Sequence, residues 1–81
     1  MKATKLINKL TKMNISHEVI NHNDWNFEIR FIMGGKVFEA SYSANSNNIS
    51  SFSRESYYCN SDQAMKYRFF DNFNQCLRSI N

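Results

Sequence analysis

The chain has no proline, two glycines and two cysteines among its 81 residues. A composition this poor in proline and glycine is not that of a linker, so we expect one folded domain spanning residues 1–81. Two cysteines are too few for a disulfide scaffold. No apolar run approaches the roughly 18–20 residues needed to cross a bilayer, and the N-terminus lacks the apolar segment of a secretory signal. We therefore expect a reduced, cytoplasmic protein.

Sequence patterns typical of catalysis or metal binding are also scarce. The candidate soft metal ligands are His17, His22, Cys59 and Cys76. None of them forms a C-x-x-C or H-x₃-H pair, which a zinc site would use. Gly34-Gly35 joins two expected strands and does not open a helix, so it lacks the form of a phosphate-binding loop. The sequence predicts no catalytic residues, no metal and no cofactor, and therefore not an enzyme.

The centre of the chain carries the clearest pattern. Two runs of alternating apolar and other residues, 27–33 and 36–42, are separated by Gly34-Gly35, which predicts a hairpin with a two-residue turn. This turn pairs Met33 with Lys36 and fixes the register of the rest. The expected apolar pairs on one face are Phe31 with Phe38, Ile29 with Ala40 and Phe27 with Tyr42. The expected pairs on the other face are Arg30 with Glu39 and Ile32 with Val37.

An amphipathic helix is expected near the N-terminus, with Thr4 as its N-cap. Its apolar face holds Leu6, Ile7, Leu10 and Met13. Lys5, Lys9 and Lys12 recur at the same period on the opposite side. Residues 1–14 hold four lysines and no acid, a charge of +4, whereas the remaining six basic and seven acidic residues give −1. The basic character of this +3 chain is therefore predicted to be local to the first helix.

Three further elements complete the expected fold. Ile15 to Asn21 indicates a first strand, and Ile49 to about Arg54 indicates an edge strand with Phe52 as its main apolar contact. A long final helix is expected from the N-cap Ser61 onward. Its apolar stripe consists of Met65, Phe69, Phe73, Cys76, Leu77 and Ile80. The fold class is α+β, with a helix, a three- or four-stranded antiparallel sheet and a helix, both helices on one sheet face.

Lys5, Lys9 and Lys12 are the first candidate partner-binding site. They could contact phosphates or an acidic protein patch. The alternative is that they form the solvated face of a surface helix, as such stripes commonly do. Membrane attachment is not expected, because the apolar face of this helix has no aromatic residue.

Exposed aromatics form the second candidate site. Trp25 stands in an Asn-rich turn, and Tyr57-Tyr58 lies beside the expected edge strand. Both residue types are enriched at binding hot spots, and both also close the ends of small cores. On the outer sheet face, Ile32 and Val37 add an apolar pair. The strand at residues 49–54 could pair with its twin, which would give a homodimer.

The order of helix, strands and helix resembles double-stranded-RNA-binding domains and the HicA-type toxins that share their fold. Those RNA-binding domains carry lysines at the start of the final helix, where this chain has Ser61-Asp62-Gln63-Ala64. The toxins carry a glycine–serine–histidine signature on a strand, and neither His17 nor His22 lies in one. This resemblance is one of architecture.

In general character the chain resembles small proteins of phages and mobile elements, a group that includes anti-CRISPR proteins. The shared features are a short single domain, twelve asparagines, many aromatics and no catalytic motif. The resemblance implies an inhibitor that occupies a surface of a host protein or ribonucleoprotein complex. The alternative is a small nucleic-acid-binding module that places Lys5, Lys9 and Lys12 on phosphates.

Overall fold

The computed structural model of the chain describes residues 1–59 and 64–80, and only the backbone of residues 57–59, 64 and 65. It is an α+β domain, as predicted, in which two helices flank an antiparallel sheet in sequence order. The sheet has five strands and not the predicted three or four, because part of the expected final helix is a strand. The helices are α1 (Ala3–Lys12) and α2 (Phe73–Arg78). The strands are β1 (His17–Asn21), β2 (Asn26–Met33), β3 (Lys36–Ser43), β4 (Ile49–Cys59) and β5 (Ala64–Phe70).

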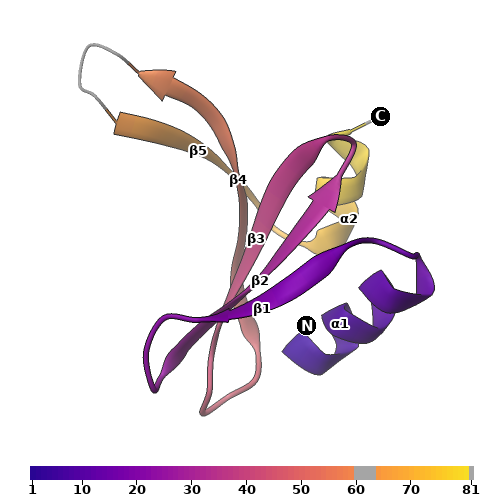
Figure 1. Cartoon of the computed structure of the whole chain (residues 1–81), viewed down its shortest axis with the longest axis vertical. Helices are drawn as coiled ribbons and strands as arrows, with labels where there is room; N and C mark the ends of the chain where they lie inside the picture. Colours follow the sequence, from indigo (N-terminus) through magenta and orange to yellow (C-terminus); the bar gives the residue numbers. More distant parts are fainter. Residues whose placement is uncertain (60–63, 81) are drawn as a thin grey trace.

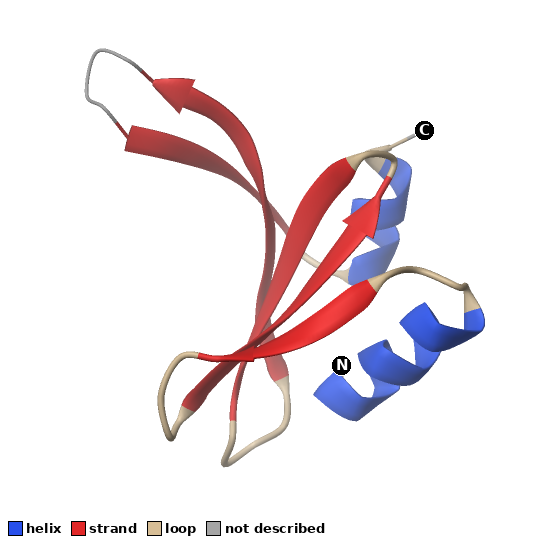
Figure 2. Cartoon of the chain, in the orientation of Figure 1, coloured by secondary structure: helices blue, strands red, loops and turns tan. Residues whose placement is uncertain are grey.

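The sheet is a meander, in which each strand pairs with its neighbours in sequence (Figures 1 and 2). The predicted hairpin is confirmed with its register, from Met33 opposite Lys36 to Phe27 opposite Tyr42. Gly34 and Gly35 have φ angles of +56° and +73°, the left-handed conformation that a tight hairpin turn requires. The first strand is also confirmed, although β1 begins at His17, two residues later than expected.

One hydrophobic core joins both helices to one face of the sheet. From the helices it takes Leu6, Leu10, Phe73 and Cys76, and from the sheet Ile29, Phe31, Phe38, Ala40, Phe52 and Phe70. Phe31 lies at its centre, because its ring stacks on Phe38 at 5.4 Å and also contacts Phe73 at 5.9 Å. The other sheet face, which we call the outer face, is left without a helix (Figure 1).

The prediction of a long final helix is wrong over the first half of its length. Residues 64–70 form β5, and the helix begins only at Phe73, with Asn72 as its N-cap; Ser61 lies outside the described residues. The Asn72 side chain accepts a hydrogen bond from the Gln75 amide at 2.9 Å, and Gln75 Oε1 accepts one from the Asp71 amide. This reciprocal capping fixes the start of the helix.

Two smaller predictions are also wrong. Ile49 to Arg54 belongs to a strand that lies between β3 and β5, so it is not an edge and cannot pair with a twin. The edges of the sheet are β1 and β5. Thr4 does not cap α1; the N-cap is Lys2, which makes no side-chain cap and is instead tied to Asn48 by a β-bridge.

Candidate binding surfaces

The lysines of α1 lie along its exposed face, as the sequence predicts. Lys2, Lys5, Lys9 and Lys12 surround one shallow surface region together with Thr4 and Asn8. Lys9 also reaches toward α2, where its ammonium lies 5.7 Å from the centre of the Phe73 ring. Lys2 is tethered, because its ammonium donates to the Ser46 carbonyl at 3.0 Å. The free part of this surface is therefore Lys5 and Lys12.

Trp25 is exposed at the turn between β1 and β2, with 62% of its surface accessible. The turn is built by Asn23, whose side-chain oxygen accepts hydrogen bonds from the amides of Trp25 and Asn26. The Trp25 carbonyl accepts a hydrogen bond from the Ala44 amide, so the β3–β4 turn is its neighbour. Trp25 does not close the core and remains available for contact.

Tyr57 and Tyr58 lie in β4, paired with Lys66 and Met65 of β5 near the end of that hairpin. Their side chains are outside the described part of the structure. The β1–β2 turn, which holds Trp25, and the outer end of the β4–β5 hairpin, which holds these tyrosines, lie at opposite ends of the sheet (Figure 1). The structure therefore does not bring the predicted aromatic residues together into one site.

The outer face carries most of the acidic side chains in the middle of the sheet. Strand alternation places Glu18, Glu28, Glu39 and Glu55 there, four of the seven acidic residues, with Arg30 among them. Glu28 is buried and in hydrogen-bond contact with His22 Nε2, and its carboxylate lies 3.7 Å from the Arg30 guanidinium. Burial, together with the charge of Glu28, raises the pKa of Glu39 above its usual range.

Exposed apolar side chains border these acids on the same face. We call them the outer patch: Ile32 (51% exposed), Val37 (40%), Tyr67 (45%) and Phe69 (70%). Ile32 and Val37 are direct cross-strand partners, as the sequence predicts. The β5 members were missed, because Phe69 had been placed on the buried stripe of a helix. The signal that could have found them is the alternation of Tyr67 and Phe69 with Lys66, Arg68 and Phe70.

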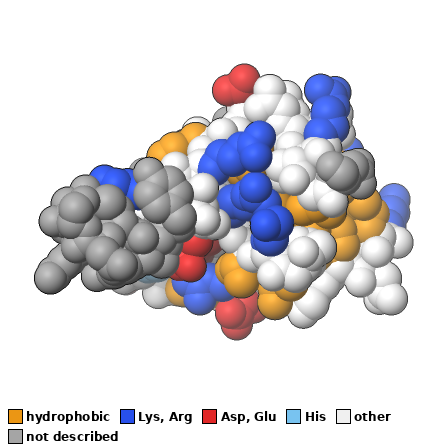
Figure 3. Space-filling model, turned by 90° about the horizontal axis from the view of Figure 1, so that it is seen from above, with side chains coloured by type: hydrophobic (Ala, Val, Ile, Leu, Met, Phe, Trp, Pro, Cys, Tyr) orange, Lys and Arg blue, Asp and Glu red, His pale blue; other side chains and the backbone are white. Residues whose placement is uncertain are grey.

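Arginines that the sequence analysis did not single out gather on the opposite side of β4 and β5. Arg54 and Arg68 are direct cross-strand partners. Both lie against core aromatics, with the Arg54 guanidinium 5.7 Å from the Phe38 ring centre and that of Arg68 5.0 Å from the Phe70 ring centre. Lys and Arg side chains are grouped near the middle of the face shown in Figure 3. The basic character is therefore not confined to α1.

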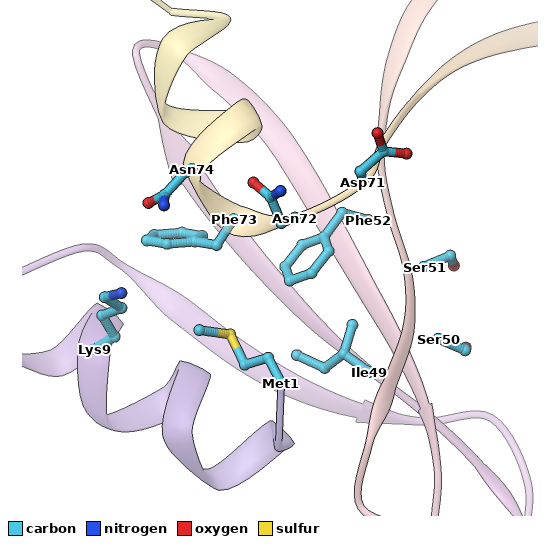
Figure 4. A pocket seen from close by; sticks show the side chains of 10 residues that line it. All are labelled: Met1, Lys9, Ile49, Ser50, Ser51, Phe52, Asp71, Asn72, Phe73 and Asn74. Carbon is cyan, nitrogen blue, oxygen red and sulfur yellow. The ribbon is translucent and has the colours of Figure 1, made fainter.

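A small hollow also lies between α1, α2 and β4. It has a volume of about 160 Å³, large enough for several water molecules. Figure 4 shows Met1, Ile49, Phe52 and Phe73 facing this space, with Lys9 on its α1 side. Phe52, Phe73 and Ile49 of its lining belong to the core or its border, and most of the other lining residues are polar or charged.

Comparison with protein-family models, with curated proteins and with solved structures gave no match. Among the described residues, no three His, Cys, Asp or Glu side chains gather as metal ligands would. Within those residues, too, no helix has the length and apolar character needed to span a bilayer. The geometry of the surfaces is therefore the basis for assigning a function.

Proposed function

We propose that this protein binds a basic surface of a host macromolecular complex with its outer face and inhibits that complex by occlusion, as an anti-CRISPR protein does. The observation that carries the proposal is the outer patch, in which Ile32, Val37, Tyr67 and Phe69 are each 40–70% exposed. The patch consists of two apolar pairs, Ile32 with Val37 and Tyr67 with Phe69, separated on this face by Ser53 and Glu55 of β4. Exposed apolar groups gathered on one face of a small monomer, bordered by polar residues, mark interaction surfaces. Trp25, 62% exposed at one end of the sheet, can extend the contact.

Charge complementarity supports a basic partner. Glu18 and Glu55 are exposed on the outer face, and Glu39 is partly exposed between them. Arg30 is the basic side chain that alternation places among them, and it is already 3.7 Å and 3.9 Å from the carboxylates of Glu28 and Glu39. An apolar patch beside unpaired carboxylates fits a protein surface rich in Lys and Arg, such as one that holds nucleic acid.

The test uses tagged protein as bait in a lysate of the host cell and compares three forms. The first is the natural chain, and the second carries Ile32→Asp and Tyr67→Asp in the outer patch. The third carries Met13→Asp, a matched control because Met13 and Tyr67 are both 45% exposed and Met13 lies beyond the end of α1. The substituted positions are 45–51% exposed and lie outside the core, so all three forms should fold, and thermal denaturation checks this.

We expect the natural chain and Met13→Asp to retain one partner in stoichiometric amount, and the double variant to bind it at least about 30-fold more weakly, as loss of a hot spot does. If the partner is a CRISPR effector complex, the purified effector should cleave target DNA more slowly when the natural chain is added. Retention by all three forms, or no stoichiometric partner, contradicts the proposal. A dimer that the double variant converts to monomer would show instead that a second copy covers the patch.

A further inference from the structure

We propose that Arg54, Arg68 and Arg78 form a binding site for the phosphate groups of single-stranded nucleic acid. Its arginines lie on the opposite side of β4 and β5 from the outer patch, and the proposal does not depend on the function proposed above. Arg54 and Arg68 are its base, and Arg78 from the last turn of α2 is its third cation. Phe69 belongs to the outer patch and also lines the hollow beside Arg68, where β5 forms the edge of the sheet.

The first argument is the pairing of like charges. Arg54 and Arg68 are direct cross-strand partners, an arrangement that destabilises a strand pair when the charges are alike. None of the ion pairs among the described residues involves Arg54, Arg68 or Arg78. Glu55, which follows Arg54, points to the other face of the sheet, and Asp71, the nearest acid in sequence to Arg68 and Arg78, accepts a hydrogen bond from Gln75 Nε2 at 3.2 Å. The repulsion is therefore left for a bound anion to offset.

The second argument is the state of the arginine donors. The Nε and Nη1 atoms of Arg54 are buried, and no protein group accepts a hydrogen bond from them. A buried donor without an acceptor costs roughly 1–3 kcal/mol, so native structures seldom keep one without a use. The Arg54 guanidinium lies between the rings of Phe38 and Phe70, at 5.7 Å and 5.9 Å from their centres. Stacking of this kind holds the Arg54 group in place as a fixed positive charge, and the exposed Arg68 and Arg78 supply the N–H groups that contact a phosphate.

The third argument is the shape of the surface beside this pair. Arg68 and Arg78 line a hollow of about 220 Å³, together with Phe69, Phe70, Gln75 and Ser79. Phe69 is the most exposed large apolar residue described, at 70%. Single-stranded nucleic acid is bound in this way, by a basic groove for its backbone and an aromatic ring on which a base stacks. Duplex DNA keeps its bases stacked inside, so it cannot use Phe69.

The side of the sheet that carries the arginines also carries α1. Lys5 and Lys12 are exposed on that helix, so a strand leaving the arginines finds further positive charge on the same side of the molecule. Positive charge at two separate places on one side of the molecule favours an extended polyanion over a small one such as free phosphate. The arginines, rather than the lysines, are expected to hold the strand, because a guanidinium binds phosphate through two N–H groups at once.

The experiment measures binding of a labelled oligonucleotide of about 12 deoxythymidines by fluorescence anisotropy. It starts at about 50 mM salt and follows the salt dependence. The test variant carries Arg68→Gln and Arg78→Gln, which removes two exposed arginines and leaves the partly buried Arg54 to support the core. The matched control carries Lys5→Gln and Lys12→Gln, which removes the same charge from α1. Thermal denaturation confirms that both variants fold.

We expect the natural chain to bind the single strand with a log–log salt slope of about −2, close to −0.7 for each of three phosphates. The arginine variant should bind at least about tenfold more weakly, with a slope nearer −0.7, and the lysine control should change less. Phe69→Ser should weaken the single-strand complex by about tenfold through the lost base stack.

Three results overturn the proposal. The first is no binding at about 50 mM salt. The second is an arginine variant that binds as well as the natural chain, or a larger loss in the lysine control, which would assign the contact to α1. The third is a duplex that binds as tightly as the single strand, or displacement of the oligonucleotide by inorganic phosphate at equal phosphate concentration. Either outcome of the third kind would show that the site does not bind single-stranded nucleic acid specifically.

Discussion

Cys76 is fully buried in the core, where it packs as a small apolar side chain. Burial raises the pKa of its thiol from the ordinary 9.0 to about 11, although Arg54 nearby opposes the shift. At neutral pH the folded protein therefore holds about 100-fold less thiolate than a free cysteine would. The stability that this group contributes is complete below pH 9 and is lost as the pH rises toward 11.

The first prediction concerns the reactivity of this thiol. In a Cys59→Ser variant, Cys76 is the remaining cysteine, and a disulfide reagent should label it at neutral pH at least about 100-fold more slowly than in denaturant. The measurement is the rate of thiol release, read as absorbance, with and without urea. Rapid labelling of the folded protein would show that Cys76 is accessible and that α2 is not packed against the sheet.

Glu39 gives a pH-dependent prediction. Its pKa is raised by burial and by Glu28, so the folded state favours the protonated carboxyl. The stability that it contributes is complete below its ordinary pKa of 4.5 and is lost as the pH rises through the raised value. Glu39→Gln removes the charge, so this variant should melt at a higher temperature than the natural chain at about pH 7, and the difference should shrink at about pH 4.

Glu18→Gln is the control for Glu39, because it removes one carboxylate from an exposed position on the same face. Thermal melts of the three proteins at both pH values decide the matter. If Glu39→Gln is the less stable protein at neutral pH, then the contact with Arg30, 3.9 Å away, outweighs burial and the charge of Glu28.

At the scale of the element, the β2–β3 turn predicts a difference between its two glycines. Both have positive φ, a conformation that costs an L-residue roughly 1–2 kcal/mol. A Cβ on Gly35 would meet no atom, whereas one on Gly34 would lie 3.1 Å from the Ile80 Cβ. Gly35→Ala should therefore lower the free energy of unfolding by about 1 kcal/mol, and Gly34→Ala by more. Urea denaturation measures the free energy of unfolding of both variants. Equal decreases would mean that Ile80 moves aside to accommodate the added methyl group at position 34.

The hairpin could be predicted from the sequence because several signals agree there. The turn glycines, the alternation and the cross-strand pairs, such as Arg30 with Glu39, all specify one register. The residues after Cys59 send conflicting signals. Phe69 and Phe73 are four residues apart, a helical spacing, while the inward positions of β5 include Arg68, which does not look like a core residue. Capping by Asn72 and Gln75 was the local clue to the true helix start.

The same conflict limited the prediction of sites. The lysines of α1 could be placed from helical periodicity alone, and the structure confirms their exposure. The pairing of Arg54 with Arg68 could not be predicted, because residues 64–70 were predicted as helix and Arg68 then has no strand partner. Tyr67 and Phe69 were lost for that reason as well. A site whose residues are brought together by strand pairing can be predicted only when the register of those strands is known.

At the scale of the whole molecule, the sheet separates charge. Strand alternation turns Glu18, Glu28, Glu39 and Glu55 to the outer face, while Arg54 and Arg68 point to the side that carries the helices. A net charge of +3 therefore describes neither side. The two proposed surfaces are opposite in charge and share only Phe69, so substitutions at their other residues alter one surface at a time.

The meander has a consequence for how the chain reaches its fold. Each strand finds its partner directly before or after it, so every pairing closes only a short loop, and closing a short loop costs little entropy. Proteins with such sequence-local topology reach the native state faster than sandwiches or barrels whose partners lie far apart. Because the chain contains no proline, no slow prolyl isomerisation delays refolding, and the molecule should regain its structure in a single rapid phase after denaturation.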